Sequence, residues 1–354
     1  MAGTASGRTG CNRRDQEDTS PSGNVALVPM TNFEEDRSEN PWASETGHQP
    51  VMRAEVADAL ACRPTAVYVD CTLGLGGHTE AILERTVPDG VVIGIDRDAE
   101  ALALAEKRLA RHAGRFILTQ GAFGDLPAIV GALQEAPPPH FPAPPYDISG
   151  ILFDLGVSSF QLDHPERGFS FQKPGPLDMR MDRAQEKTAA DWVNRASERA
   201  LTTLIRAYGE ERWAKRIASA IFQHRRTVGD ILRVETLEQV IWRAIPAHAR
   251  HGRIHPATRT FQALRIAVND EMTQLQVGLG AAISLLAPGG RLVVLSFHSL
   301  EDRCVKQMFK GAAMRKEEKR FINLHRKPVR TGIEECARNP RSRSAKMRVL
   351  ERAA

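Results

Sequence analysis

The segment VYVDCTLGLGGHTEAILERTVPDGVVIGID (residues 67–96) contains a complete strand, turn, helix and second strand. Its apolar runs at residues 67–71 and 91–95 predict two buried strands, and residues 80–85 predict a helix between them. The glycines of the intervening turn let the backbone approach a ligand closely, and an acid, Asp96, ends the second strand. This arrangement is typical of the nucleotide-binding half of a doubly wound α/β sheet.

Similar elements continue along the chain. We expect helices at residues 99–112 and 260–286, strands at residues 116–119, 151–154, 291–297 and 347–350, and a proline-rich surface loop at residues 136–145. Ser299 and Asp302 are expected to cap the helix that follows the strand at residues 291–297. The alternation of strands and helices predicts a mainly parallel sheet.

The fourth predicted strand ends on Asp154 and leads into a long polar segment, rich in Gly, Pro and Ser, that extends to residue 182. Open α/β sheets bind ligands beyond the carboxyl ends of their strands, so an acid at this boundary predicts an active site. The alternative is that Asp154 only caps a loop.

From about residue 167 to residue 254 the chain shows helical signals only. Thr188 and Asp191 predict a capping box, and apolar residues recur at helical spacing after it. Basic and acidic residues are interleaved along these helices, which a solvated, salt-bridged surface explains as well as a phosphate-binding one does. We therefore expect an all-helical subdomain inserted into the α/β unit.

Composition places the chain among ordinary globular proteins. It has 354 residues, of which 42% are hydrophobic, so it can bury a full core. The net charge of +5 modestly favours a polyanionic partner. No apolar run is long enough to cross a membrane, and the N-terminus lacks a secretory signal, so we expect a cytoplasmic protein. Residues 1–46 have no hydrophobic periodicity and are expected to be disordered. The five cysteines are scattered and indicate reduced thiols.

The glycine turn discriminates between cofactors. A dinucleotide fingerprint would need glycine where Thr79 stands, and the turn lacks the Gly-Lys-Ser/Thr of a P-loop. Asp96 lies 20 residues beyond Gly76, where an acid would bind ribose hydroxyls. S-adenosylmethionine is therefore the first choice of cofactor and NAD the second.

Ten short motifs resemble one known family. They are HQPVM (48–52), GGHT (76–79), DRD (96–98), DLGVSS (154–159), RGFSF (167–171), GPLDMRM (175–181), YGEER (208–212), HPATRTFQ (255–262), SFHSLEDR (296–303) and NPRSRS (339–344). In this order they resemble the RsmH (MraW) family, the bacterial 16S rRNA cytosine-N4 methyltransferases. Residue Leu75 departs from the small or varied residues usual in the glycine loop, and the N-terminal extension has no counterpart that we can name.

The resemblance implies a class I S-adenosylmethionine-dependent methyltransferase, with a Rossmann-like, mainly parallel seven-stranded sheet and an inserted all-helical subdomain. The implied division is a disordered extension at residues 1–46, the first part of the methyltransferase core at 47–165, the helical substrate-recognition domain at 166–255, and the second part of the core, with a basic C-terminal segment, at 256–354.

The family's cofactor contacts fall on matching positions of this sequence. They are Gly76, Gly77, His78, Asp96, Phe123, Asp154 and Gln161. Phe123 offers an apolar face to adenine, although a phenylalanine there is as often a core residue. His78 could equally be a polar residue at the start of a helix. S-adenosylmethionine is the implied cofactor, and no metal is expected.

The implied reaction is methylation of the N4 amine of a 16S rRNA cytosine, position 1402 of the decoding site, in the small ribosomal subunit. Asp154 is the expected catalytic residue, since it can accept hydrogen bonds from the amine together with the Leu155 carbonyl. Phe160, Phe169 or Phe171 could stack on the base. The expected RNA contacts are Arg167, Arg180, Lys215, Arg216, Arg259, His298, Arg341 and Arg343.

Some alternatives remain open from the sequence. His298 could instead be a helix-capping neighbour of Ser299. The substrate could be DNA or protein, or the chain could be a ribosome-assembly factor that binds rRNA without turnover. The sequence does not decide whether the protein forms a homodimer; it predicts no association with a membrane.

Overall fold

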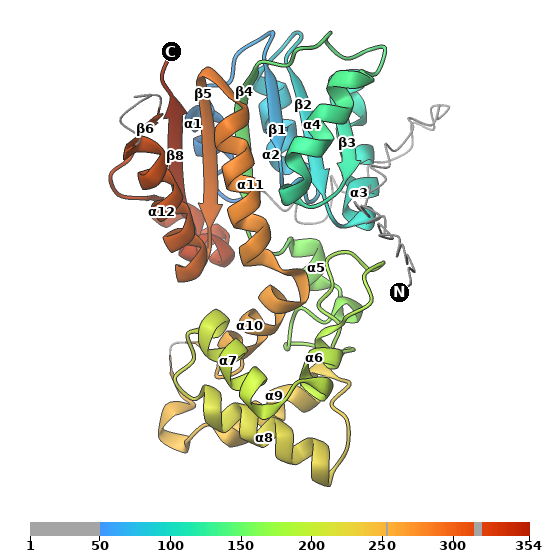
Figure 1. The fold of residues 1–354 in the computed structure, drawn as a ribbon, viewed down its shortest axis with the longest axis vertical. Helices are drawn as coiled ribbons and strands as arrows, with labels where there is room; N and C mark the ends of the chain where they lie inside the picture. Colours follow the sequence, from blue (N-terminus) through green and yellow to red (C-terminus); the bar gives the residue numbers. More distant parts are fainter. Residues whose placement is uncertain (1–49, 253, 315–320) are drawn as a thin grey trace, which may run out of the picture.

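The computed structural model describes residues 50–252, 254–314 and 321–354, so the extension expected to be disordered lies outside the described residues. A twisted sheet with helices on both faces forms one half of the molecule, and a group of helices forms the other (Figure 1). The strands are β1 (Val67–Asp70), β2 (Val91–Asp96), β3 (Phe116–Gln120), β4 (Ile148–Asp154), β5 (Leu286–Ser296), β6 (Phe321–Asn323), β7 (Val329–Arg330) and β8 (Lys346–Arg352).

The strand order is β3-β2-β1-β4-β5-β8-β6, and the short β7 also pairs with β8. Neighbours from β3 to β5 are parallel, whereas β8 is antiparallel to β5, β6 and β7. The mainly parallel sheet is thus confirmed, with one two-residue strand, β7, beyond the seven expected. The strand expected at residues 347–350 is β8, and it lies between two other strands because β6 pairs along its outer side.

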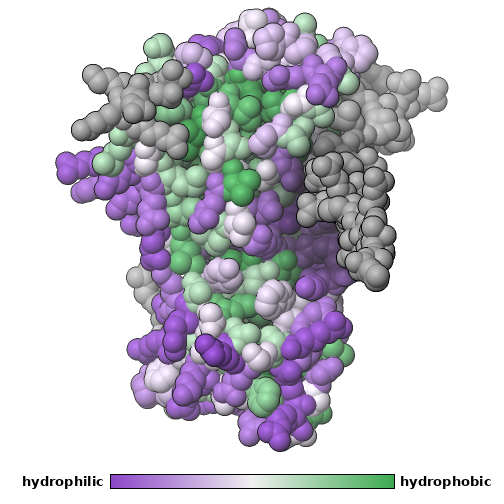
Figure 2. Space-filling model, viewed as in Figure 1, coloured by the Kyte–Doolittle hydropathy of each residue, from purple (hydrophilic) through white to green (hydrophobic). Residues whose placement is uncertain are grey.

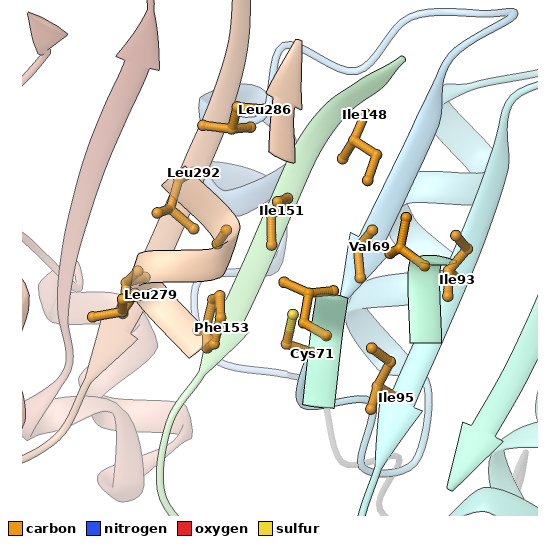
Figure 3. Packing of buried hydrophobic residues seen from close by; sticks show 14 of the residues in the cluster. Val69, Cys71, Ile93, Ile95, Ile148, Ile151, Phe153, Leu279, Leu286 and Leu292 are labelled. Carbon is orange, nitrogen blue, oxygen red and sulfur yellow. The ribbon is translucent and has the colours of Figure 1, made fainter. Parts of the chain in front are cut away.

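Both faces of the sheet are buried, as the continuous apolar runs of its strands require. Successive side chains of a strand point to opposite faces, so Tyr68 and Val92 belong to one core cluster and Val69 and Ile93 to another. Figure 3 shows the second cluster, in which the strand residues pack together with Leu279 of α11. This two-sided burial holds the carboxyl ends of the parallel strands in place.

The helices divide into those that cover the sheet and those of the helical half (Figure 1). The first group is α1 (Arg53–Ala59), α2 (Gly77–Arg85), α3 (Ala99–Leu109), α4 (Leu126–Glu135), α11 (Glu271–Leu285) and α12 (Ser299–Met314). The second is α6 (Ala189–Arg195), α7 (Glu198–Gly209), α8 (Ala214–Thr227), α9 (Val234–Ala244) and α10 (Thr258–Asn269). The remaining elements are α5 (Ser159–Asp163), α13 (Ile333–Arg338) and the 3₁₀ helices η1 (Ala110–His112), η2 (Phe123–Asp125), η3 (Pro165–Arg167), η4 (Ala247–Ala249) and η5 (Pro340–Ser344).

The helices of the second group have their own hydrophobic core. The capping box predicted at the start of α6 is confirmed: the Thr188 hydroxyl accepts from the Asp191 N–H at 3.2 Å, and the Asp191 carboxylate accepts from the Thr188 N–H at 2.9 Å. Hydrophilic side chains cover most of this half on the face shown in Figure 2.

The single helix predicted at residues 260–286 is wrong. The chain forms two helices, α10 and α11, separated by Asp270 in the left-handed conformation with φ of 48°. The preceding Asn269 is buried, and its side-chain amide accepts from the Met181 N–H and donates to the Met179 carbonyl, each at 2.8 Å. These tertiary hydrogen bonds favour the break, and aspartate is one of the residues that tolerates the left-handed region. The apolar spacing continues across the break because each helix buries its own apolar face.

The two helices belong to different cores. Phe261 and Leu264 of α10 pack in the cluster of the helical half, whereas Leu275 and Leu279 of α11 pack against the sheet. The predicted domain boundary at residue 255 stays a proposal, and the packing leads us to propose that the helical unit extends to Asn269. Asp270 is then the junction between the two halves.

Within the described residues, no helix is long and apolar enough to span a membrane. The four described cysteines, Cys62, Cys71, Cys304 and Cys336, are free thiols.

Candidate functional site

A cavity of about 510 Å³ lies at the carboxyl ends of the parallel strands. Loops that follow β1, β2, β4 and β5 line it, as expected for a ligand site in an open α/β sheet. Six of the predicted cofactor residues line this cavity: Gly77, His78, Asp96, Phe123, Asp154 and Gln161. The structure therefore brings together residues that are up to 84 positions apart in the sequence, although their binding of a cofactor stays a proposal.

Gly76 is the predicted cofactor residue that is not in the cavity lining. It precedes α2 with φ of 77°, in the left-handed region where a side chain is strained. Its neighbour Gly77 needs the absence of a side chain for a different reason, because a Cβ atom there would lie 3.0 Å from the Pro50 ring. The turn therefore depends on both glycines, and Gly77 is the one beside the cavity.

Asp96 ends β2 and holds the glycine turn. Its carboxylate accepts from the Gly74 N–H at 2.7 Å and from the Asp98 N–H at 2.9 Å. Burial raises the pKa of Asp96 to about 6, although these two backbone hydrogen bonds act in the opposite direction. The carboxylate keeps further lone pairs with which it could accept from the hydroxyls of a ribose.

We expect the affinity of the protein for S-adenosylhomocysteine to be constant above pH 7 and to fall on the acid side of pH 6. The decrease approaches about tenfold per pH unit, because protonation of Asp96 below its raised pKa removes the carboxylate that we propose as acceptor for the ribose. Calorimetric titration between pH 5 and pH 8 measures this profile. Asp96→Asn should bind weakly at every pH without an inflection near 6. An unchanged wild-type affinity across this range would show that no titration of Asp96 affects binding there, and wild-type affinity of Asp96→Asn would remove Asp96 from ligand binding.

Asp154 ends β4 with an unsatisfied side chain. Its backbone N–H donates to the Thr72 hydroxyl at 2.6 Å, but its buried Oδ1 atom has no hydrogen-bond partner within the described chain. Its Oδ2 atom lies 3.4 Å from Nε2 of His78, without the geometry of a hydrogen bond. The carboxylate accepts from no loop N–H of the described residues, so the arrangement is not the loop cap considered as the alternative.

The His78 imidazole is buried beside Asp154, and neither of its nitrogens has a hydrogen-bond partner among the described residues. Buried polar atoms are normally satisfied, so unpartnered ones around a cavity indicate a place for polar groups of a ligand. The donor and acceptor atoms of His78, Asp96 and Asp154, together with the apolar ring of Phe123, fit the charged and aromatic parts of S-adenosylmethionine.

Asp70, at the end of β1, does not line the cavity but supports residues that do, and the sequence did not single it out. It is fully buried and accepts from the Thr79 hydroxyl at 2.8 Å and from the Thr72 N–H at 3.2 Å. Burial raises the pKa of the Asp70 carboxyl above its usual value, although the nearby His78 acts in the opposite direction. Its position at a strand end, like that of Asp96 and Asp154, was the signal that could have identified it.

Phe123 and Gln161 both border the cavity and both have structural contacts. The Phe123 ring packs edge-on against Phe153 with ring centroids 5.7 Å apart, so it combines the two roles considered for it. The Gln161 amide accepts from the Ser158 N–H at 3.1 Å and donates to the Asp98 carboxylate at 2.9 Å. Gln161 therefore positions the loop after β4 and bounds the cavity.

Arg167 was expected to contact RNA, and this prediction is wrong. Its side chain is 2% exposed, and its Nη2 atom lies 2.7 Å from the Asp98 carboxylate. The same nitrogen donates to the carbonyls of Arg180 and Met181. A guanidinium enclosed in this way cannot reach a phosphate. A basic residue in a polar loop looks the same in sequence whether its partner is a phosphate or a distant carboxylate.

Arg180 is also engaged internally. Its guanidinium binds the Asp178 carboxylate through two hydrogen bonds of 2.7 and 2.8 Å and donates to the carbonyls of Arg183 and Gln185. The side chain is 19% exposed. It orders the chain before α6, and the structure gives it little surface for a phosphate.

Five of the predicted RNA contacts are exposed: Lys215, Arg216, Arg259, Arg341 and Arg343. Lys215 and Arg216 lie on α8, in the helical half of the molecule (Figure 1). Arg341 lines the cavity and forms an ion pair of 2.7 Å with Asp163. The structure thus brings one of these cations to the cavity, and the contacts of all five with RNA stay proposals.

His298 precedes α12 and is 11% exposed. Its Nδ1 atom accepts from the Glu301 N–H at 3.3 Å, and its Nε2 atom lies 2.9 Å from the Glu301 carboxylate, so the observed contacts are those of a helix-end residue. The predicted cap by Ser299 and Asp302 is wrong: Ser299 donates to Glu210, and Asp302 pairs with β8. Glu301 replaces this cap, because its carboxylate accepts from the two N–H groups before the helix.

An ion-pair cluster beside the cavity was not predicted. Arg265 binds the Glu271 carboxylate through two hydrogen bonds of 2.8 Å and lies 3.8 Å from Glu301. Glu271, His298 and Glu301 also place possible metal-ligand atoms within 4.8 Å of one another. The Arg265 guanidinium already supplies the positive charge at this cluster, so we propose no metal site there.

The strand order, the glycine turn and the strand-end acids around one cavity define a class I methyltransferase of Rossmann-like fold. The chain belongs to the MraW methylase family, whose family model matches residues 45–353. This membership confirms the predicted family and the use of S-adenosylmethionine as methyl donor.

Two relatives are each named ribosomal RNA small subunit methyltransferase H. The protein of Geobacter sulfurreducens is 50% identical over 317 residues, which cover 86% of this chain and 98% of the relative. The protein of Methylococcus capsulatus is 48% identical over 312 residues, which cover 86% of this chain and the whole of the relative. The similarity therefore extends over both the sheet and the helical half.

Proposed function

We propose that this protein transfers a methyl group from S-adenosylmethionine to the N4 amine of a cytosine in the 16S rRNA of the small ribosomal subunit, at position 1402 of the decoding site, where the modification tunes decoding. The names of the relatives support the rRNA substrate. One observation supports an amine as the group that receives the methyl: the buried carboxylate oxygen of Asp154 at the cavity has no hydrogen-bond partner within the described chain and can accept from an amine N–H.

The cytosine amine is a poor nucleophile because its lone pair is conjugated into the ring. When bound, the methyl donor supplies an electrophilic methyl group: the nitrogen–carbon bond forms as the sulfonium–carbon bond breaks, and S-adenosylhomocysteine leaves. Asp154 contributes by accepting a hydrogen bond from the amine and turning its lone pair toward the methyl group. The methylated nitrogen is strongly acidic and loses one proton to Asp154 or to water.

The target base has to leave its stack or be unpaired to enter a cavity of this kind. Backbone contacts would then position the RNA without specifying its sequence. Arg341 supports this role, since it is exposed and borders the cavity.

The experiment that tests this function maps methylated cytosines in 16S rRNA from cells with and without the protein. We expect loss of the methyl group from one cytosine N4 in its absence and its return when the protein is supplied. Methyl transfer to DNA or protein but not to ribosomal subunits would contradict the proposal. Unchanged rRNA methylation combined with defective subunit assembly would favour an assembly factor without turnover.

A further inference from the structure

The cavity extends on both sides of Asp154. In the sheet, β4 lies between β1, which is followed by the glycine turn and by the helix α2 that carries His78, and β5, which is followed by Phe297. The predicted cofactor residues Asp96 and His78 lie on the β1 and β2 side of Asp154. The β5 side is lined by Phe297, Arg265 and other residues to which the cofactor assignment gives no role.

The three aromatic residues expected to stack on the base lie outside the cavity lining. Phe169 is buried in the core of the helical half. Phe171 packs against His255 and Phe261, with ring centroids 4.7 and 5.0 Å apart. Phe160 of α5 packs against His164, which directly follows that helix, with ring centroids 4.2 Å apart. Among the described residues, the aromatic rings that line the cavity, apart from His78, are those of Phe123 and Phe297.

The position of Phe297 is fixed by the chain around it. Its N–H donates to the Glu301 carboxylate at 2.7 Å, and its ring reaches to 3.8 Å from the point where a Cβ atom of Gly156 would lie. Gly156 is two residues after Asp154, so the Phe297 ring borders the loop that carries the catalytic carboxylate. Glu301 is therefore a positioning residue for this ring.

Arg265 presents one nitrogen at the same place. Its Nε and Nη2 atoms are held by Glu271, whereas Nη1 makes no hydrogen bond with the described residues and lies 4.0 Å from the same point beside Gly156. The bidentate ion pair holds the guanidinium plane, so the Nη1 donors have a defined direction before any ligand binds.

We infer that Phe297 and Arg265 form the pocket of the target cytosine: the phenyl ring stacks on the base, and Nη1 of Arg265 donates to N3 or O2 while Asp154 accepts from N4. Cytosine presents N4, N3 and O2 along one edge, as a donor followed by two acceptors. Uracil instead places an N–H at position 3, which would face the Arg265 donors, so this arrangement selects cytosine. The inference rests on the proposed function and assigns the substrate contacts of the same cavity.

The test compares Phe297→Leu, Phe297→Tyr and Arg265→Lys in methyl transfer to small-subunit rRNA. Lysine keeps a positive charge beside Glu271, which protects the fold, but it lacks the planar guanidinium whose Nη1 atom would donate to the base. We expect kcat to fall about 10- to 100-fold for Phe297→Leu and Arg265→Lys, from the loss of stacking or of a charged hydrogen bond. Phe297→Tyr keeps the aromatic face and should remain within about threefold of wild type.

Two further measurements separate this role from a structural one. KM for the rRNA should change by less than about threefold, because phosphate contacts dominate its binding. Calorimetric affinity for S-adenosylhomocysteine should also stay within about threefold, since the changed residues lie on the other side of Asp154. The matched control is Arg195→Lys, because Arg195 is 81% exposed on α6 and should not affect turnover.

The outcomes distinguish the two proposals. If the wild-type protein methylates the rRNA and the Phe297→Leu and Arg265→Lys variants turn over within twofold of it, the base pocket is wrong and the proposed function stands. If both variants lose S-adenosylhomocysteine affinity more than about tenfold, their effect lies in the cofactor site or the fold, and the pocket is again wrong. If the wild-type protein leaves small-subunit rRNA unmodified, the proposed function fails, and the pocket assignment fails with it.

Discussion

Asp154→Ala is expected to lower kcat for methyl transfer to small-subunit rRNA by at least about a hundredfold. The loss is comparable to that of one preorganised hydrogen-bonding group in an enzyme site, because the variant removes the acceptor that we propose orients the cytosine amine. S-adenosylhomocysteine affinity should stay within about tenfold, since the other cofactor residues remain in place. Transfer of a labelled methyl group and calorimetric titration measure the two quantities.

The matched control for this prediction is Asp147→Ala. Asp147 is exposed just before the opposite end of the same strand, so its removal takes away a carboxylate without approaching the cavity. It should leave turnover unchanged. Asp154→Asn keeps one acceptor oxygen and should have activity between that of wild type and that of Asp154→Ala. Turnover by Asp154→Ala at the wild-type rate would remove this side chain from the mechanism.

The fold was largely predictable because its signals are local. Continuous apolar runs predicted β1, β2, β3 and β4, and the glycine turn placed α2 after the first of them. The break at Asp270 was not predictable from apolar spacing, because the pattern is the same for one long helix as for two helices whose apolar faces enter different cores. What determines the break is a left-handed residue together with hydrogen bonds from Asn269 to a segment about 90 residues away.

The residues of the candidate site also fall into those that local sequence signals identified and those that depend on tertiary contacts. Asp96 and Asp154 were identified because each ends a strand of a parallel sheet, and such ends meet at one edge. Phe297 also follows a strand, but a phenylalanine carries no charge that marks it in sequence. The partners of Arg265 lie on the following helices, and their pairing depends on the angle between those helices. Contacts of this kind are set by tertiary packing, which residue spacing does not encode.

Arg167 was predicted from sequence to contact RNA, but the structure buries it in an ion pair with Asp98. Its replacement is expected to be the most destabilising of the substitutions proposed for this protein. Arg167→Met should lower the free energy of unfolding by about 3–5 kcal/mol, since it leaves the buried Asp98 carboxylate without its positive partner. Methionine keeps much of the volume of the side chain, so the loss reports the charge and the hydrogen bonds of the guanidinium rather than a cavity. Chemical denaturation followed by circular dichroism measures it.

Two controls establish that the buried pair causes this loss. Arg183 also pairs with Glu100, but its side chain is 50% exposed. Arg183→Met should therefore lower the free energy of unfolding by less than about 1 kcal/mol. Asp98→Asn removes the buried charge while keeping a side-chain oxygen for the Glu100 N–H, so adding it to Arg167→Met should recover more than half of the lost stability. Recovery is expected because two neutral side chains carry no uncompensated charge. Equal losses for Arg167→Met and Arg183→Met would show that the ion pair with Asp98 does not hold the loop after β4 against the sheet.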